Sequence, residues 1–250
     1  SGRVFRVAKP SGGTREVTTL GLEECIAQRA LLIGLAPHLE RQFLPCSYAY
    51  RPGRDRLHAL LQAEQWRQEG YLYAFRSDIS GCFDHLKHGH LERTLRQLVP
   101  SRGVRVLVQQ WLETVGRPQF LRTRIGIPQG AVLSPLLANV YLHPVDRSLS
   151  RRGLRLIRYG DDILVATRTE GEATRAGAAV SAALRRVSLG LNEEKTHIAP
   201  MGGLRFLGEQ LPLLDRPFPG TEGDVAQFTR SPHWLRAFGA PPRKASGRPR

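Results

Sequence analysis

The stretch that decides the fold is residues 156–165, LIRYGDDILV, which places two adjacent carboxylates at a turn between two apolar runs. The runs are rich in residues that favour strands, whereas aspartate is depleted from strands and neighbouring acids repel each other. This pattern predicts a β-hairpin over residues 154–167 with Asp161 and Asp162 at its tip. Mg²⁺ suits such a pair, because it binds hard carboxylate oxygens and bridges to substrate phosphates. A solvated hairpin tip that carries two acids and no ligand is the plain alternative.

Composition indicates a globular protein with a polyanionic partner. The 250 residues are 41% apolar and 24% charged, enough for a large core in one domain or two closely packed lobes. The net charge of +15 favours nucleic acid over a membrane surface, because the basic residues are not gathered on one amphipathic helix. No apolar run is long enough to span a bilayer. Cys25, Cys46 and Cys82 lack the spacing of a disulfide framework or metal site, so we expect free thiols in a reducing cytoplasm.

Hydrophobic periodicity predicts an α+β order of elements. From residue 71 to residue 199 the order is strand, helix, helix, hairpin, helix, strand, which is typical of a ferredoxin-like layer. The expected strands are residues 5–9, 15–18, 71–79 and the hairpin, followed by a closing pair at 195–199 and 204–210. A helix is also expected over residues 172–188.

Two further helices are expected to have marked apolar faces. The helix over residues 22–40 has on one face Leu22, Ile26, Ala30 and Ile33. The helix over residues 104–113 is expected to turn inward Leu107, Val108, Trp111 and Leu112. From residue 213 onward periodicity is lost and prolines recur, so residues 215–250 are expected to be a linker or the stub of a further module.

A third acid ends the strand pattern of residues 71–79. In a ferredoxin-like sheet this central strand lies beside the hairpin, so Asp78 is expected to face Asp161 and Asp162. Three carboxylates at one strand edge can bind two metal ions about 3.5–4 Å apart, as in enzymes that displace phosphoryl groups in line. Asp84 stands where the next helix begins, and we expect an N-cap there before a metal ligand.

Seven short motifs follow one another along the chain. They are residues 9–15 (KPSGGTR), 47–53 (SYAYRPG), 78–84 (DISGCFD), 127–139 (IPQG, then LSPLLAN), 159–162 (YGDD), 191–196 (LNEEKT) and 206–208 (FLG). The last five resemble the successive palm motifs of reverse transcriptases, and the first two resemble the fingers of the bacterial group II intron-like branch. A single motif is weak evidence, but seven in register over roughly residues 3–210 are specific.

The resemblance implies an α+β right-hand polymerase with fingers and a palm, the palm sheet being ferredoxin-like, antiparallel and backed by helices. The fingers are expected at residues 1–70 and 99–125, and the palm at residues 71–98 and 126–212. Residues 213–250 are expected to be a Pro/Arg-rich linker or thumb stub, with the thumb absent or truncated.

The resemblance also assigns the catalytic machinery. Asp78, Asp161 and Asp162 resemble the catalytic metal ligands, joined by the backbone carbonyl of Ile79. The cofactor implied is two Mg²⁺ ions, for which Mn²⁺ can substitute. Lys195 resembles a lysine near the leaving pyrophosphate that can donate a proton, although a surface lysine is the plain reading.

Four residues resemble nucleotide-binding positions. Lys9 and Arg15 resemble the fingers cations that clamp the triphosphate, against a reading as ordinary surface cations. Phe83 resembles the steric gate whose ring leaves no room for a 2′-hydroxyl, against a reading as a core aromatic. Gln129 resembles a residue that touches the nucleotide sugar, against a loop amide that bonds backbone.

Four more positions are expected to contact primer or template: Tyr159, Gly130, Arg51 and Arg54. The chain departs from the family pattern at Gly160, where the group II branch most often has alanine. The chain also starts at the first fingers motif, and the comparison with the family pattern leads us to expect no helical thumb within these 250 residues. Either those parts were removed, or the chain comes from a free-standing or fused relative such as a CRISPR-associated reverse transcriptase joined to an integrase.

The function implied is that of an RNA-directed DNA polymerase, which adds dNTPs to a primer 3′-hydroxyl by two-metal nucleotidyl transfer. The partners implied are an RNA template, a DNA or RNA primer, and either intron RNA or a CRISPR integrase, in the bacterial cytoplasm and without a membrane. An RNA-dependent RNA polymerase also uses Gly-Asp-Asp and is one alternative. A non-catalytic nucleic-acid-binding module that has kept the fold is another.

Overall fold

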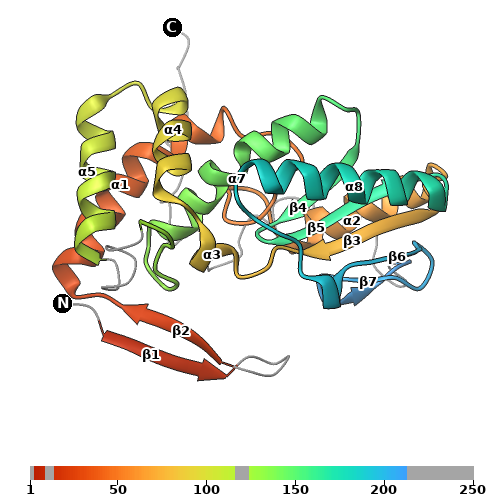
Figure 1. The fold of residues 1–250 in the computed structure, drawn as a ribbon, viewed down its shortest axis with the longest axis horizontal. Coiled ribbons are helices and arrows are strands. Elements are labelled where there is room, and N and C mark those ends of the chain that lie inside the picture. Colours follow the sequence, from red (N-terminus) through yellow and green to blue (C-terminus); the bar gives the residue numbers. More distant parts are fainter. Residues whose placement is uncertain (1–2, 9–13, 116–123, 213–250) are drawn as a thin grey trace, which may run out of the picture.

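The centre of the molecule is a four-stranded antiparallel sheet in the strand order β4-β5-β3-β6 (Figure 1). The structure, a computed structural model, describes residues 3–8, 14–115 and 124–212. The strands of this sheet are β3 (Tyr73–Asp78), β4 (Arg155–Tyr159), β5 (Asp162–Thr167) and β6 (His197–Pro200). Each central strand is antiparallel to both of its neighbours, which is the ferredoxin-like arrangement that the sequence predicts.

Two helices cover one face of this sheet: α7 (Ser134–Ser150) and α8 (Glu170–Arg186). The side chains of the sheet and of these helices form one continuous apolar core. The contact is close, because a Cβ added at Gly177 of α8 would lie 2.6 Å from the ring of Phe75 in β3. Thr169 begins α8 by accepting a hydrogen bond from the Glu172 N–H at 3.3 Å.

The opposite face of the sheet packs against α2 (Arg56–Gln68) and a small hairpin, β7 (Arg205–Phe206) with β8 (Glu209–Gln210). The expected pairing of residues 195–199 with 204–210 is therefore wrong. β6 instead completes the edge of β3, while β7 and β8 pair across a two-residue turn. Leu207 and Gly208 both have positive φ there, as a tight type I′ hairpin requires.

The rest of the described chain forms a helical region beside the sheet, from which a hairpin projects (Figure 1). Its helices are α1 (Leu22–Glu40), α3 (Cys82–His85), α4 (His88–Leu98) and α5 (Arg102–Val115). The hairpin is β1 (Arg3–Ala8) with β2 (Thr14–Thr19), close to the strands expected from sequence. A short 3-10 helix, η1 (Glu193–Lys195), leads into β6.

The helix faces expected from periodicity differ from those observed. On α1, Leu22, Ile26 and Ile33 do share a face, but their side chains are 77%, 61% and 53% exposed. The core side of α1 is instead formed by other residues: Gln28, Leu32, Leu35, Ala36 and Leu39. This helix is apolar on several sides, so a list of apolar positions does not select the side that packs. On α5, Leu107 is half exposed rather than turned inward, whereas Trp111 is buried as expected.

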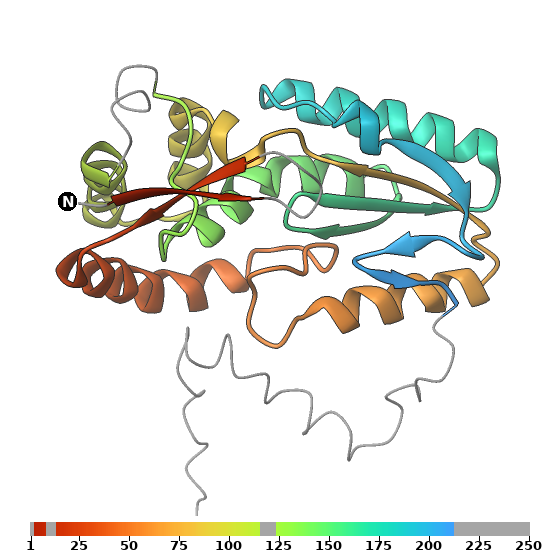
Figure 2. The ribbon, with the colours of Figure 1, turned by 90° about the horizontal axis from the view of Figure 1, so that it is seen from below.

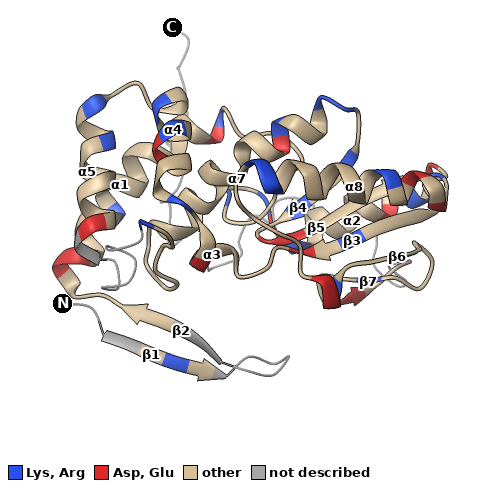
Figure 3. Cartoon of the chain, in the orientation of Figure 1, with Lys and Arg blue, Asp and Glu red and all other residues tan. Residues whose placement is uncertain are grey.

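Basic residues lie over both the helical region and the sheet region, as Figure 3 shows. No single helix carries them, which matches the spread of the +15 net charge along the sequence. None of the described helices is both long enough and apolar enough to cross a bilayer.

Candidate active site

The three acids expected to act together do lie together, at one end of the central strands. Asp78 ends β3 and is paired directly with Asp162, the first residue of β5. Asp161 precedes it in the turn from β4, and its carbonyl accepts a hydrogen bond from the Ile79 N–H at 3.0 Å. One carboxylate oxygen from each of the three acids lies within 4.8 Å of the others. This is the only such cluster of possible metal ligands among the residues that the structure describes.

Local backbone geometry explains how two of these acids reach the tip of a hairpin. Tyr159 and Asp162 are paired, so the turn between them holds only Gly160 and Asp161. Gly160 has a φ of +67°, which a glycine adopts without steric cost and which fits the first position of a type II′ turn. The acid pair is thus held at the very end of two buried strands.

The acid cluster carries more negative charge than its surroundings balance. Burial and the neighbouring Asp78 raise the pKa of Asp161 to about 6, and the same two causes raise the pKa of Asp162. The cations nearby are Lys195, whose Nζ lies 2.8 Å from an oxygen of Asp78, and Arg76, 3.9 Å from an oxygen of Asp162. A hydrogen bond to Asp78 in turn raises the pKa of Lys195.

The donor set fits a hard divalent cation. The three side chains offer only carboxylate oxygens, and these lie near enough to share one or two ions. The raised pKa values of Asp161 and Asp162 reflect repulsion and burial that a bound cation would relieve. Mg²⁺ is such a cation, and Asp78, Asp161 and Asp162 are the residues that would hold it.

Sequence reasoning missed Arg158, a fully buried arginine that anchors the turn carrying Asp161 and Asp162. Its Nε and Nη2 donate to both carboxylate oxygens of Asp146 on α7, at 2.8 and 2.7 Å. Its remaining N–H groups donate to Asn139 Oδ1 at 2.9 Å, to Ser47 Oγ at 2.8 Å and to the carbonyl of Gly160 at 3.1 Å. The available signal was an arginine inside an apolar strand pattern, next to the acid pair.

The loop that carries Gln129 docks on the projecting hairpin. The Gln129 carbonyl accepts a hydrogen bond from the Thr18 N–H of β2 at 2.7 Å. A Cβ at Gly130, where φ is +94°, would lie 2.7 Å from Val17 and 2.8 Å from the Thr18 carbonyl. The same loop is hydrogen-bonded to α3: the Ile127 N–H donates to the carbonyl of the half-buried Phe83 at 2.8 Å. The structure thus links Gln129, Gly130 and Phe83 through one loop.

Several expected site residues are placed differently. Arg51 is buried, and its guanidinium donates to Glu40 and to the carbonyls of Leu44 and Ser47, so the expectation that it contacts primer or template is wrong. Its charge holds the 47–53 segment together. The expectation that Asp84 is an N-cap is also wrong, because the N-cap of α3 is Gly81.

Two more of these residues are partly committed to local contacts. Arg54 donates to the Pro45 carbonyl at 2.7 Å, and its guanidinium stacks 5.2 Å above the Tyr48 ring. Tyr159 is half-buried and packs with the core on the α2 face of the sheet. Lys9 lies outside the described residues, and so does the side chain of Arg15.

Comparison with known proteins agrees with the palm-like sheet and its carboxylate edge. The family model described as "Reverse transcriptase (RNA-dependent DNA polymerase)" matches residues 7–211. The chain therefore belongs to the reverse transcriptase family.

Relatives and solved structures extend this result. The group II intron-encoded protein LtrA of Lactococcus lactis is 30% identical over 147 residues, which cover 58% of this chain and 24% of LtrA. Protein YkfC of Escherichia coli is 30% identical over 158 residues, covering 61% of this chain and 41% of YkfC. The chain therefore spans less than half the length of these relatives. A solved telomerase from Candida tropicalis has a similar fold, with a TM-score of 0.59 at 12% identity over 80% of this chain and 50% of that one.

Proposed function

We propose that the chain is an RNA-directed DNA polymerase that adds dNTPs to a primer 3′-hydroxyl. The observation that carries this proposal is the set of three carboxylates with oxygens within 4.8 Å of one another, at the strand edge of a reverse transcriptase palm. All three acids, Asp78, Asp161 and Asp162, stand at positions that resemble the family's metal ligands. The likeness to LtrA further supports a group II intron-like reverse transcriptase.

The residues of the chain have separate tasks in this proposal. Asp78, Asp161 and Asp162 would hold two Mg²⁺ ions, with the Ile79 carbonyl as a further ligand, and the ions would supply Lewis-acid activation and charge neutralisation. Lys195, whose Nζ lies 2.8 Å from an oxygen of Asp78, is proposed to donate a proton to the leaving pyrophosphate. Arg158 fixes the hairpin through the Gly160 carbonyl.

Selection of the nucleotide is assigned to the region around the 126–130 loop. In this proposal Phe83 is the steric gate under the sugar and Gln129 contacts the nucleotide. The hydrogen bond from the Ile127 N–H, in the loop of Gln129, to the Phe83 carbonyl supports a shared site. Lys9 and Arg15 clamp the triphosphate from the projecting hairpin. Such cations suit phosphate, since arginine binds it through two parallel hydrogen bonds.

The nucleic acid is assigned to the surface beside the acids. Tyr159 and Gly130 contact the primer end and template, and Arg54 contributes charge near the 47–53 segment. The basic net charge supports binding to the phosphates of an RNA template and its primer, with little reading of sequence. Intron RNA or a CRISPR integrase is the further partner of this proposal.

We also propose fingers at residues 1–70 and 99–125, palm at residues 71–98 and 126–212, and a linker or thumb stub at residues 213–250. Helix α2 is an exception to this division: it lies within residues 1–70, proposed as fingers, but it packs against β4 and β5 of the palm sheet. Three free cysteines are in keeping with a reducing bacterial cytoplasm.

Primer extension tests the proposal directly. The 250-residue chain is incubated with poly(rA)/oligo(dT), dTTP and Mg²⁺, beside the Asp161→Ala Asp162→Ala variant. We expect Mg²⁺-dependent extension by the wild type and none by the variant. Absence of extension by both proteins contradicts the proposal and favours a non-catalytic binding module. Equal extension by both also contradicts it, because the synthesis would not depend on Asp161 and Asp162.

The choice between DNA and RNA synthesis depends on Phe83. We expect the wild type to prefer dNTPs and the Phe83→Ala variant to incorporate rNTPs much more readily. Preferential use of rNTPs by the wild type favours the alternative of an RNA-dependent RNA polymerase. Phe83 also packs against the core, so folding of the variant is checked by circular dichroism.

A further inference from the structure

Helix α1 is apolar on the side that borders solvent as well as on the side that packs. Its inner side contributes Leu32, Leu35 and Leu39 to the core. On its outer side, Ile26 and Ile33 are more than half exposed. Figure 2 shows α1 along the edge of the molecule that lies opposite α8. Helices that are apolar all round are normally buried, so this face is expected to be covered by a partner.

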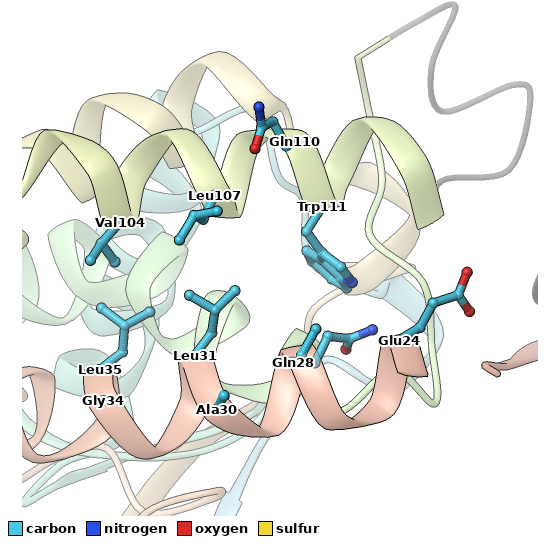
Figure 4. A pocket seen from close by; sticks show the side chains of 11 residues that line it. Glu24, Gln28, Ala30, Leu31, Gly34, Leu35, Val104, Leu107, Gln110 and Trp111 are labelled. Carbon is cyan, nitrogen blue, oxygen red and sulfur yellow. The ribbon is translucent and has the colours of Figure 1, made fainter. Parts of the chain in front are cut away.

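A groove of about 640 Å³ runs between α1 and α5 beside this face (Figure 4). The α1 wall includes small residues as well as Leu31 and Leu35, and the α5 wall includes Leu107. Gln28 also lines the groove and is 1% exposed. Its Oε1 accepts from the Leu133 N–H at 3.2 Å, but its Nε2 has no hydrogen-bond partner among the described residues. A buried donor without an acceptor is costly, which also indicates that an occupant is missing.

Small residues occupy the middle of the exposed face. Ala27, Ala30 and Gly34 are all exposed and line the groove. A Cβ at Gly34 would meet nothing within 4 Å, so packing among the described residues gives no reason for a glycine there. A glycine inside a helix costs about 1 kcal/mol relative to alanine. Close approach of a second helix backbone would account for it.

Opposite charges mark the two ends of the same face. Glu23 and Arg41 are 18 positions apart, which is five turns of an α-helix, so they lie in line on one side of α1. Ala30 lies near that line, between them. Neither charged side chain has an ion-pair partner among the described residues.

We propose that two copies of the chain associate through this face, with their α1 helices antiparallel. In that arrangement Glu23 of each copy lies near Arg41 of the other, and Ala30 of each lies near Gly34 of the other. A two-fold interface must be self-complementary. The acid at the start of α1 and the base at its end meet this condition when two copies of the helix run in opposite directions. A parallel pair would instead set Glu23 against Glu23. The small residues bring the helices close, and Leu107 of α5 borders the same contact.

Sedimentation equilibrium over a range of concentrations tests this pairing on the 250-residue chain. We expect the wild type to dimerise and Ala30→Glu, which sets an acid of each copy against Gly34 of the other near the centre of the contact, to raise the dissociation constant at least about tenfold. Ala178→Glu is the matched control, because Ala178 is an exposed alanine in the middle of α8. A wild type that stays monomeric at all concentrations, or equal effects of the two variants, overturns the proposal.

A charge exchange tests the antiparallel order. Glu23→Arg alone and Arg41→Glu alone each put two like-charged pairs into the contact, and we expect each to weaken association several-fold. The variant with both changes restores both pairs, and we expect wild-type association. Because both side chains are on the surface, these variants should keep the fold, which circular dichroism checks. Association of the double variant that is no tighter than that of the single variants overturns the antiparallel pairing.

Discussion

Two clusters of charged side chains each include residues of the β4–β5 hairpin, and their charges are balanced to different degrees. The pair of Arg158 and Asp146 is 1% exposed on both sides, and every N–H donor of Arg158 has an acceptor within the chain. The carboxylates of Asp78, Asp161 and Asp162 face mainly one another, and Asp161 and Asp162 follow Arg158 closely in the chain. Their nearby cations are an exposed lysine and an arginine at 3.9 Å.

The difference separates a structural role from a functional one. A buried charge that is fully paired inside the chain needs nothing from outside and fixes geometry. In the acid cluster, burial and mutual repulsion raise the pKa values of Asp161 and Asp162. Such a cluster is a candidate binding site for a cation from outside the chain. The balanced cluster positions the unbalanced one, since Arg158 donates to the carbonyl of Gly160, the residue before Asp161.

The largest effect is expected from neutralising the unbalanced cluster. Asp161→Asn Asp162→Asn removes two metal ligands of the proposed enzyme, so primer extension should fall by at least about 10³-fold. The free energy of unfolding without metal should stay the same or rise, because repulsion between acids is removed. Urea titration in EDTA measures it. Glu170→Gln, at an exposed acid of α8, is the control and should change neither quantity. A large loss of stability in the double variant would give these acids a structural role instead.

The balanced cluster is expected to respond in the opposite way. Arg158→Met leaves Asp146 buried and unpaired, which should lower the free energy of unfolding by about 3–5 kcal/mol. Arg158→Met Asp146→Leu removes both charges and should recover most of that loss. Urea unfolding of the two variants measures the difference. If the double variant is no more stable than the single one, the cost lies in lost packing and hydrogen bonds rather than in an unpaired charge.

The sequence predicted the acid cluster because its cause is topological. Once residues 71–79 and the hairpin are strands of one ferredoxin-like sheet, Asp78 and the turn acids must meet at one end of neighbouring strands, as the pairing with Asp162 confirms. The projecting hairpin and α1 also follow from local patterns, namely a Gly-rich turn and a long apolar periodicity.

What the sequence did not predict depends on three-dimensional neighbours. Arg51 appears in a basic turn and looks like a surface cation, yet Glu40 and three carbonyl groups enclose it. The side-chain partners of Arg158 lie 12 to 111 positions away, and no local pattern reports them. The pairing of β6 with β3 rather than with residues 204–210 is equally non-local.

A pH titration sharpens the comparison through Asp161. Its pKa is about 6 in the folded protein against 3.8 for an ordinary aspartate, so the native state binds its proton more tightly than the unfolded chain. Protonation of Asp161 therefore stabilises the folded state, and this contribution to the free energy of unfolding is fully present below pH 4. It is lost as the pH rises through about 6. The expected loss is about 1–2 kcal/mol after allowance for solvent screening.

The variant Asp161→Asn isolates this contribution from those of the other carboxyl groups. The difference in unfolding free energy between wild type and variant, measured in EDTA from pH 4 to pH 7, should shift in favour of the variant as pH rises. Saturating Mg²⁺ should reduce the shift, because the cation binds the ionised acid. A difference that stays constant with pH would mean that Asp161 titrates normally.

The smallest effect is expected at the turn itself. Gly160→Ala places a side chain at a φ of +67°, which costs about 1 kcal/mol for a residue with a Cβ. The nearest atom of Tyr50 would be 3.6 Å from the new Cβ, an ordinary contact, so space does not forbid the change. Gly153→Ala is the matched control, because Gly153 has a similar φ of +73° and nothing within 4 Å of the new Cβ. Both variants should lose similar stability in urea, but only Gly160→Ala should raise the Mg²⁺ concentration needed for half-maximal extension. If the two variants need the same Mg²⁺, the turn conformation does not help to place the acids, and Arg158 alone must hold them.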